Sequence, residues 1–185
     1  MFRLKITDSY SHLFGEQILK YEYAEIYNEI KKILTKTIIK PTKISKEQGR
    51  EGLLLFSGPD FNVPIGEILS QKGWLKRKVY YPNQHRFFID VDYCKKRVGC
   101  ELQFGKYAFV QHDIYKFLYL FSAGKTDAID VGIEVIPSAT LARKMYSGVA
   151  VFDSVITAVK GHARNEPAMP IWFVGIDIEQ ISSKK

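Results

Sequence analysis

The sequence lacks features that define several large classes of protein. Its 185 residues include two cysteines, Cys94 and Cys100, and no second Cys or His pair stands at zinc-finger spacing from them. This excludes a disulfide scaffold and a structural zinc site, and both cysteines are expected to be free thiols. Lys, Asp or Glu interrupts every apolar run well before the roughly 20 residues that a membrane span needs. We therefore expect no membrane partner.

The chain also lacks signs of division or export. It has no internal repeat, no low-complexity tract and no Pro- or Ser-rich linker, so we expect a single domain over residues 1–185. Met1 leads into a mixed polar segment without the apolar region of a secretory signal, which predicts a cytoplasmic protein.

Several catalytic signatures are missing as well. The sequence has neither a phosphate-binding loop nor a dinucleotide-binding fingerprint. His112 and His162 have no partner motif for a nucleophilic triad, so each is expected to be a surface or capping residue. A metabolic enzyme built on one of these motifs is therefore disfavoured.

The charge is unbalanced toward the positive. Lys and Arg number 27 against 20 Asp and Glu, which gives a formal net charge of +7, and the basic residues are spread through the chain. Such a field attracts nucleic acid and speeds encounter with it. The alternative is that a basic surface has no functional meaning, as in many soluble proteins.

Hydrophobic periodicity and turn residues divide the chain into helices and strands. Helices are expected over residues 16–36, from Asp60 or Asn62 to 71, over 111–122 with Gly124 as its cap, and over 149–159. Strands are expected over residues 52–56, 86–93, 98–104, 131–136 and 171–176. The inner face of the 111–122 helix is predicted to be Ile114, Phe117, Leu118 and Phe121. Interleaved strands and helices indicate an α/β sheet covered by helices, with Trp74 and Trp172 in the core.

The segment that carries chemistry is a predicted hairpin. The basic connection of residues 94–97 joins its two strands. Alternation along the second strand directs Val98, Cys100, Leu102 and Phe104 to one face and Gly99, Glu101 and Gln103 to the other. Asp92 ends the first strand, so the hairpin can bring it beside Glu101. Two carboxylates and an amide then converge at one end of a sheet.

This arrangement suits a divalent cation. Two adjacent carboxylates repel each other unless a cation lies between them, and oxygen ligands favour Mg²⁺. Such an ion can hold a phosphodiester and activate the attacking water. Gln103 can hydrogen-bond that water but cannot take its proton, because its amide does not ionise. The alternative is that Asp92, Glu101 and Gln103 are solvent-facing and paired with the basic connection.

A wider set of segments resembles a known family. The runs Ile89–Asp92, Arg97–Val110 and Asp113–Phe117 are similar to restriction endonucleases of the BglII/BstYI type, within the PD-(D/E)xK nuclease superfamily. Four further segments match in the same order along the chain: Ser11–Glu16, Phe56–Trp74, Met145–Val149 and Pro170–Ile176. Phe14 departs from the Asn that is frequent in the family, and Tyr146 departs from the usual Ser. The resemblance implies a restriction-endonuclease-like fold with a central mixed β-sheet flanked by helices.

The resemblance also implies roles for particular residues. Asp92 would be the primary metal ligand, Glu101 a second acidic ligand, and the carbonyl of Leu102 a backbone ligand. Gln103, which stands where the superfamily often has Lys, would position the attacking water. Lys106 and Ser147 would contact DNA.

Alternatives remain for individual residues. Lys106 is equally suited to a phosphate contact or a solvated loop, and Ser147 to a turn or helix cap. Glu134, on the next strand, can add a carboxylate to the site, although a structural ion pair is favoured. Asp90 competes with Asp92 for the metal role, and the family spacing favours Asp92.

The expected function is that of a Mg²⁺-dependent, type II site-specific deoxyribonuclease. It would act as a homodimer on both strands of a palindromic site in double-stranded DNA, with a cognate DNA methyltransferase in the same system. The alternatives are a non-cleaving DNA-binding module and a repair or methyl-directed nuclease of the same fold.

Overall fold

The computed structural model describes residues 1–81, 84–122, 128–161 and 167–181. The helices in these ranges are α1 (Gly15–Glu22), α2 (Ala24–Lys36), α3 (Gly58–Gln71), α4 (Ala108–Ser122), α5 (Ala139–Ala142) and α6 (Phe152–Gly161). The strands are β1 (Phe2–His12), β2 (Ile38–Ile39), β3 (Lys43–Ile44), β4 (Leu54–Leu55), β5 (Leu75–Tyr81), β6 (Gln84–Lys95), β7 (Val98–Leu102), β8 (Val131–Pro137) and β9 (Ile171–Gln180). The predicted cap Gly124 and His162 lie outside the described residues.

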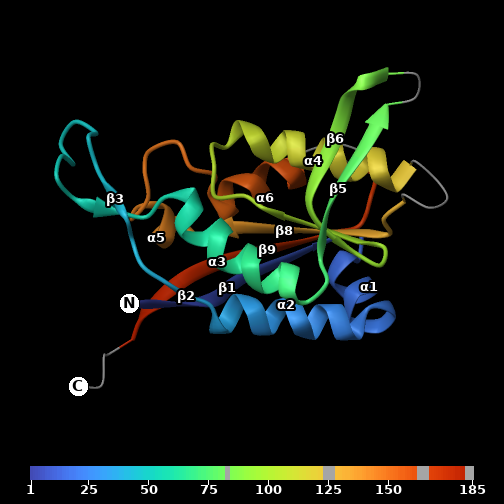
Figure 1. The fold of residues 1–185 in the computed structure, drawn as a ribbon, viewed down its shortest axis with the longest axis horizontal. Coiled ribbons are helices and arrows are strands. Elements are labelled where there is room, and N and C mark those ends of the chain that lie inside the picture. Colours follow the sequence, from blue (N-terminus) through green and yellow to red (C-terminus); the bar gives the residue numbers. More distant parts are fainter. Residues whose placement is uncertain (82–83, 123–127, 162–166, 182–185) are drawn as a thin grey trace.

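Seven strands form one twisted sheet in the order β2-β1-β9-β8-β7-β6-β5. Strands β7, β8 and β9 run parallel, whereas the other neighbouring pairs are antiparallel. Helices α1, α2 and α3 cover one face, and α4 and α6 cover the other (Figure 1). The predicted α/β fold with a central mixed sheet flanked by helices is therefore confirmed. None of the described helices is long and apolar enough to cross a lipid bilayer.

The hydrophobic core has a part on each face of the sheet. Val98, Cys100, Leu102 and Phe104 pack toward α1–α3, as the alternation predicted. Both tryptophans are core residues, each 1% exposed. Cys94 and Cys100 are buried free thiols, and burial raises the pKa of Cys94 to about 11, so this thiol is neutral.

Helix α4 lies close against the sheet because two glycines leave room for it. Gly99 on β7 and Gly132 on β8 are register partners. Phe117 of α4 packs over both: a Cβ would lie 3.0 Å from the Phe117 ring at Gly99 and 2.8 Å at Gly132. The distance at Gly132 is shorter than ordinary Cβ contacts and the distance at Gly99 is at their lower limit, so the two glycines let α4 lie close to the sheet.

Several predicted elements differ from those observed. Residues 16–36 form two helices, because Tyr23 leaves the helical region at φ −128° and ψ 40°. Helix α3 begins two residues before Asp60, since Ser57 is the N-cap and the Asp60 carboxylate accepts its backbone N–H at 2.7 Å. The inner face of α4 is Val110, Asp113, Lys116, Phe117 and Leu120, so the predicted face was rotated and Phe121 is 40% exposed.

Strands β1 and β5 were not predicted. In β1, apolar residues alternate with polar ones at Phe2, Leu4 and Ile6. A bulge between Ile6 and Asp8 then interrupts this alternation. β5 is rich in Lys and Arg, as is common for a strand at the edge of a sheet. The strands predicted over 98–104, 131–136 and 171–176 are found as β7, β8 and β9.

The turn between β1 and α1 holds a backbone conformation that suits a smaller residue. Phe14 has φ 63° and ψ 21°, in the left-handed region, and its side chain is 73% exposed. We predict that Phe14→Asn raises the free energy of unfolding by about 0.5–1 kcal/mol, because asparagine tolerates this region better. Thermal unfolding would measure the gain. Tyr21→Asn, at an 83% exposed site within α1, is the matched control and should give no gain.

Candidate functional site

Asp92 and Glu101 meet where β6 and β7 pair. Tyr93 lies opposite Cys100 in the antiparallel register, so Asp92 lies beside Glu101. The backbone N–H of Asp92 donates to Oε1 of Glu101 at 3.3 Å. The N–H of Leu102 in turn donates to Oδ2 of Asp92 at 3.4 Å. The structure therefore brings the two predicted carboxylates together at the end of one strand pair.

Asp90 does not join them. It is exposed and lies opposite Lys78 on the edge strand β5. Asp92 is half-buried and contacts the β7 backbone. The geometry thus favours Asp92 over Asp90 as the strand's contribution to the site.

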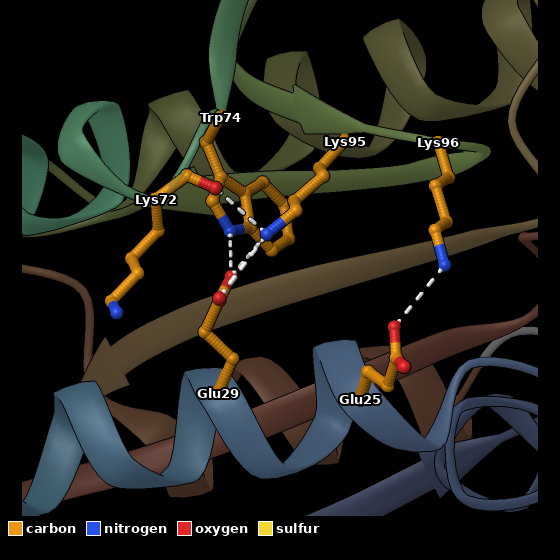
Figure 2. Close-up of polar contacts among 6 residues, drawn as sticks. All are labelled: Glu25, Glu29, Lys72, Trp74, Lys95 and Lys96. Carbon is orange, nitrogen blue, oxygen red and sulfur yellow. Dashed lines mark hydrogen bonds and ion pairs between the residues drawn. The ribbon is translucent and has the colours of Figure 1, made fainter.

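The turn that joins β6 to β7 is anchored away from the carboxylates. Nζ of Lys95 donates to both oxygens of Glu29 on α2, at 2.8 and 3.1 Å, and to the carbonyl of Lys72 at 2.7 Å (Figure 2). The indole N–H of Trp74 donates to the same Glu29 carboxylate at 2.7 Å. These contacts fix the turn to α2 and to the end of α3.

The other two basic residues of the turn are also paired elsewhere. Lys96 lies 3.5 Å from Glu25 (Figure 2), and Arg97 lies 2.6 Å from Asp130. The alternative, in which this turn forms salt bridges with Asp92, Glu101 and Gln103 at the surface, is therefore wrong. Glu101 is 2% exposed and Gln103 is 6% exposed, so neither faces solvent.

Helix α4 supplies two further polar side chains to the site. Asp113 and Lys116 are one helical turn apart and both point at the sheet, at 5% and 6% exposure. Nζ of Lys116 lies 2.8 Å from Oε1 of Glu101 and 2.8 Å from Oδ1 of Asp113. A buried ammonium thus joins a motif carboxylate to a helix carboxylate.

Gln103 is held at both ends of its amide. Its Nε2 donates to Oδ2 of Asp113, and its Oε1 accepts the backbone N–H of Gly105 at 2.9 Å. One N–H and one lone pair of the amide remain for another partner. The orientation of the amide is therefore determined by its neighbours.

A fourth carboxylate lies on the adjacent strand. Glu134 on β8 is the register partner of Glu101 and is completely buried. Neither of its oxygens has a hydrogen-bond partner among the residues that the structure describes, so the favoured structural ion pair is not found. Burial raises the pKa of Glu134 well above its usual value, and the carboxylates of Asp113 and Glu101 raise it further.

Acidic groups outnumber basic groups among the described residues of this cluster. The carboxyl groups of Glu101, Asp113 and Glu134 interact electrostatically with the ammonium of Lys116, and Asp92 interacts with those three carboxyl groups. Burial and the neighbouring Asp92 raise the pKa of Glu101 to about 9, although Lys116 opposes the shift. Close carboxylates with this imbalance favour an added cation.

The oxygen atoms at Asp92 and Glu101 fit a hard divalent ion. Carboxylates are preferred ligands of Mg²⁺. The carbonyl of Leu102 already accepts the N–H of Phe104 at 3.1 Å, which leaves it one lone pair. In the described ranges no three His, Cys, Asp or Glu side chains group as metal ligands, so an ion here would rely on two carboxylates, a carbonyl and water.

The predicted DNA-contacting residues lie on adjoining segments. Lys106 and Val149 form an isolated β-bridge, which brings the segment after β7 beside the Ser147 loop. Both Lys106 and Ser147 are exposed. Glu47 accepts the N–H and the hydroxyl of Ser147 at 2.8 and 3.2 Å. Ser147 is therefore not the cap of α6, which begins five residues later.

Sequence reasoning did not assign Asp113 or Lys116 to the site. Both stand within a run that carried the family resemblance, but the predicted inner face of α4 placed them outward. A sequence signal was available, since Asp113 and Lys116 have helical spacing with Val110, Phe117 and Leu120.

Glu134 should make the stability of the metal-free protein depend on pH. A folded Glu134 keeps a proton that the unfolded chain releases near its usual pKa of 4.5. The contribution of Glu134 to the free energy of unfolding is therefore fully present below that pH. It is lost as the pH rises through the pKa that Glu134 has in the folded protein. We predict that Glu134→Gln flattens the fall in melting temperature as the pH rises above about 5.

Thermal melts in a chelating buffer measure this effect. Glu25→Gln is the control, because Glu25 is 90% exposed and its substitution should leave the slope unchanged. An unchanged slope in Glu134→Gln would show that Glu134 ionises alike in both states.

Comparisons with known proteins identify the family and the fold. The family model for the restriction endonucleases BglII/BglIII matches residues 7–176. The crystal structure of restriction endonuclease BglII complexed with a DNA 16-mer is similar, with a TM-score of 0.75, 19% identity, and coverage of 97% of this chain and 80% of that one. The structure of free BglII matches with a TM-score of 0.61, 19% identity, and coverage of 97% and 82%. No curated protein sequence matches.

Proposed function

Because the chain belongs to the BglII/BglIII family of restriction endonucleases, which are nucleases, we propose that it is a type II site-specific deoxyribonuclease. In this proposal it uses Mg²⁺ to hydrolyse both strands of a palindromic site in double-stranded DNA. The observation that carries the proposal is the meeting of Asp92 and Glu101 on β6 and β7, with Gln103 two residues further on.

The site residues divide the chemical work. Asp92, Glu101 and the Leu102 carbonyl would hold Mg²⁺, which supplies positive charge to the phosphate. Gln103 would orient the attacking water through the N–H and lone pair that its protein contacts leave free. Because the amide does not ionise, the proton of that water must leave by another route.

Charge and position support binding to DNA. The net charge of +7 favours association with a polyanion. Lys106 can donate to O6 and N7 of guanine, and the Ser147 hydroxyl can reach several base edges. Their adjoining segments would let both residues approach one stretch of a groove.

An apolar groove beside α4 supports a homodimer. The groove has a volume of about 290 Å³, lies between α4 and α6, and includes Ile114, Leu118 and Val155 in its lining. Tyr115, which follows Ile114 on α4, is 51% exposed. A second copy of the chain would cover this groove, and two-fold symmetry would supply one site for each DNA strand.

Asp92→Ala should abolish cleavage while leaving DNA binding in Ca²⁺ largely intact, because it removes a metal ligand but no basic group. Plasmid digestion with MgCl₂ and gel-shift assays with CaCl₂ measure the two effects. Asp90→Ala is the matched control, since Asp90 lies on the same strand but is exposed, and it should cut normally. Full cleavage by Asp92→Ala would remove Asp92 from the mechanism.

The same digestion separates the other candidate functions. A restriction enzyme gives discrete fragments from unmodified plasmid, and we propose that a cognate DNA methyltransferase blocks those cuts. A repair or methyl-directed nuclease would not give fragments that methylation abolishes. A non-cleaving module would give salt-sensitive binding without nicks.

Tyr115→Glu should convert the protein to a monomer, because it places a charge in the proposed apolar interface. Analytical ultracentrifugation would measure the mass, and supercoiled plasmid would show nicking in place of double-strand cuts. Tyr21→Glu, at an 83% exposed aromatic on α1, is the control and should remain dimeric. A monomeric wild-type protein would contradict the dimer.

A further inference from the structure

One pair of residues on α4 connects the two chemically different parts of the motif. Lys116 contacts the Glu101 carboxylate and Asp113 contacts the Gln103 amide, while Lys116 and Asp113 contact each other. The side chains therefore form a continuous path from Glu101 through the helix to Gln103. All four are at most 6% exposed, so the path lies beneath the surface of the site.

Gln103 depends on this path for its orientation. A glutamine side chain has three rotatable bonds, and its amide can present either end to a partner, so fixing it costs conformational entropy. Gly105 secures Oε1, but only Asp113 is in contact with Nε2 among the described hydrogen bonds. Without Asp113, the nitrogen end would be free to rotate away.

Lys116 holds Asp113 in position and is not placed to contact DNA. Its ammonium is 2.8 Å from each of two carboxylates and is almost wholly buried. A cation held in this way is unsuited to a direct phosphate contact. It is well suited to keep Asp113 in place, since an unbalanced carboxylate buried here would be strongly destabilising.

We propose that Asp113 is a positioning residue that fixes the Gln103 amide for the attacking water, and that Lys116 holds Asp113 in place. The inference rests on the proposed nuclease function and adds to it a role for helix α4. Neither Asp113 nor Lys116 contacts substrate in this proposal, so both act through the residues of the motif.

A double-mutant cycle tests the proposal. Asp113→Asn keeps the shape of the side chain but cannot accept at both oxygens as a carboxylate does, and single-turnover cleavage should slow about 10–100-fold. Placed in a Gln103→Ala protein, the same substitution should slow cleavage by no more than about twofold, because the group that it positions is gone. DNA affinity in Ca²⁺ should stay unchanged in every variant.

One control and one substitute variant make the result interpretable. The control is Asp177→Asn, which changes another buried aspartate, on β9. Among the described hydrogen bonds, the Asp177 side chain accepts only the backbone N–H of Ile178, at 2.7 Å. This variant should cleave DNA at the wild-type rate. If Asp113→Asn does not fold, Asp113→Glu keeps the charge that balances Lys116, displaces the carboxylate, and enters the same cycle.

The outcomes separate the inference from the function on which it rests. Cleavage by the wild-type protein with effects of Asp113 and Gln103 that multiply would overturn the positioning role and leave the nuclease function intact. Weaker DNA binding by Asp113→Asn would equally overturn it, since the contact would then serve binding. Absence of wild-type cleavage with any divalent cation would overturn both.

Discussion

The site depends on the ion pair between Lys116 and Glu101. Four carboxylates gather on and above β6, β7 and β8, and such a cluster is unfavourable unless positive charge accompanies it. Lys116 supplies that charge from α4, at 2.8 Å from both Glu101 and Asp113. The strands can therefore present acidic groups at a buried position, and the helix can pack over them.

The basic turn between β6 and β7 anchors the strand pair without contacting its carboxylates. Lys95 and Lys96 pair with Glu29 and Glu25 of α2 (Figure 2), and Arg97 pairs with Asp130. Cations that are adjacent in sequence to Asp92 are thus committed to acids on other elements. The oxygens of Asp92 and Glu101 are therefore not taken up by these cations, and the strand pair that carries them is fixed at its turn.

The central strands of the sheet, including those of the motif, could be predicted from the sequence more completely than the elements around them. Alternation placed Val98 and Cys100 in the core and Glu101 on the opposite face, and a strand pair follows directly from such a pattern. Neither β1, which contains a bulge, nor the basic edge strand β5 keeps that alternation over its full length. Helical spacing relates Asp113 and Lys116 to apolar residues of α4, but Ile114, Leu118 and Phe121 are apolar too, so spacing alone did not decide which face of α4 packs on the sheet. Only three-dimensional packing, set by Phe117 over Gly99 and Gly132, decides that Asp113 and Lys116 face inward.

The two facing glycines therefore act as a spacer between helix and sheet. A Cβ at Gly132 would lie 2.8 Å from the Phe117 ring, so the ring or the helix that carries it would have to shift, and a Cβ at Gly99 would lie 3.0 Å away. A shift of α4 would carry the neighbouring Lys116 ammonium away from Glu101 on β7. The contact between Lys116 and Glu101 thus benefits from two residues that carry no functional group of their own.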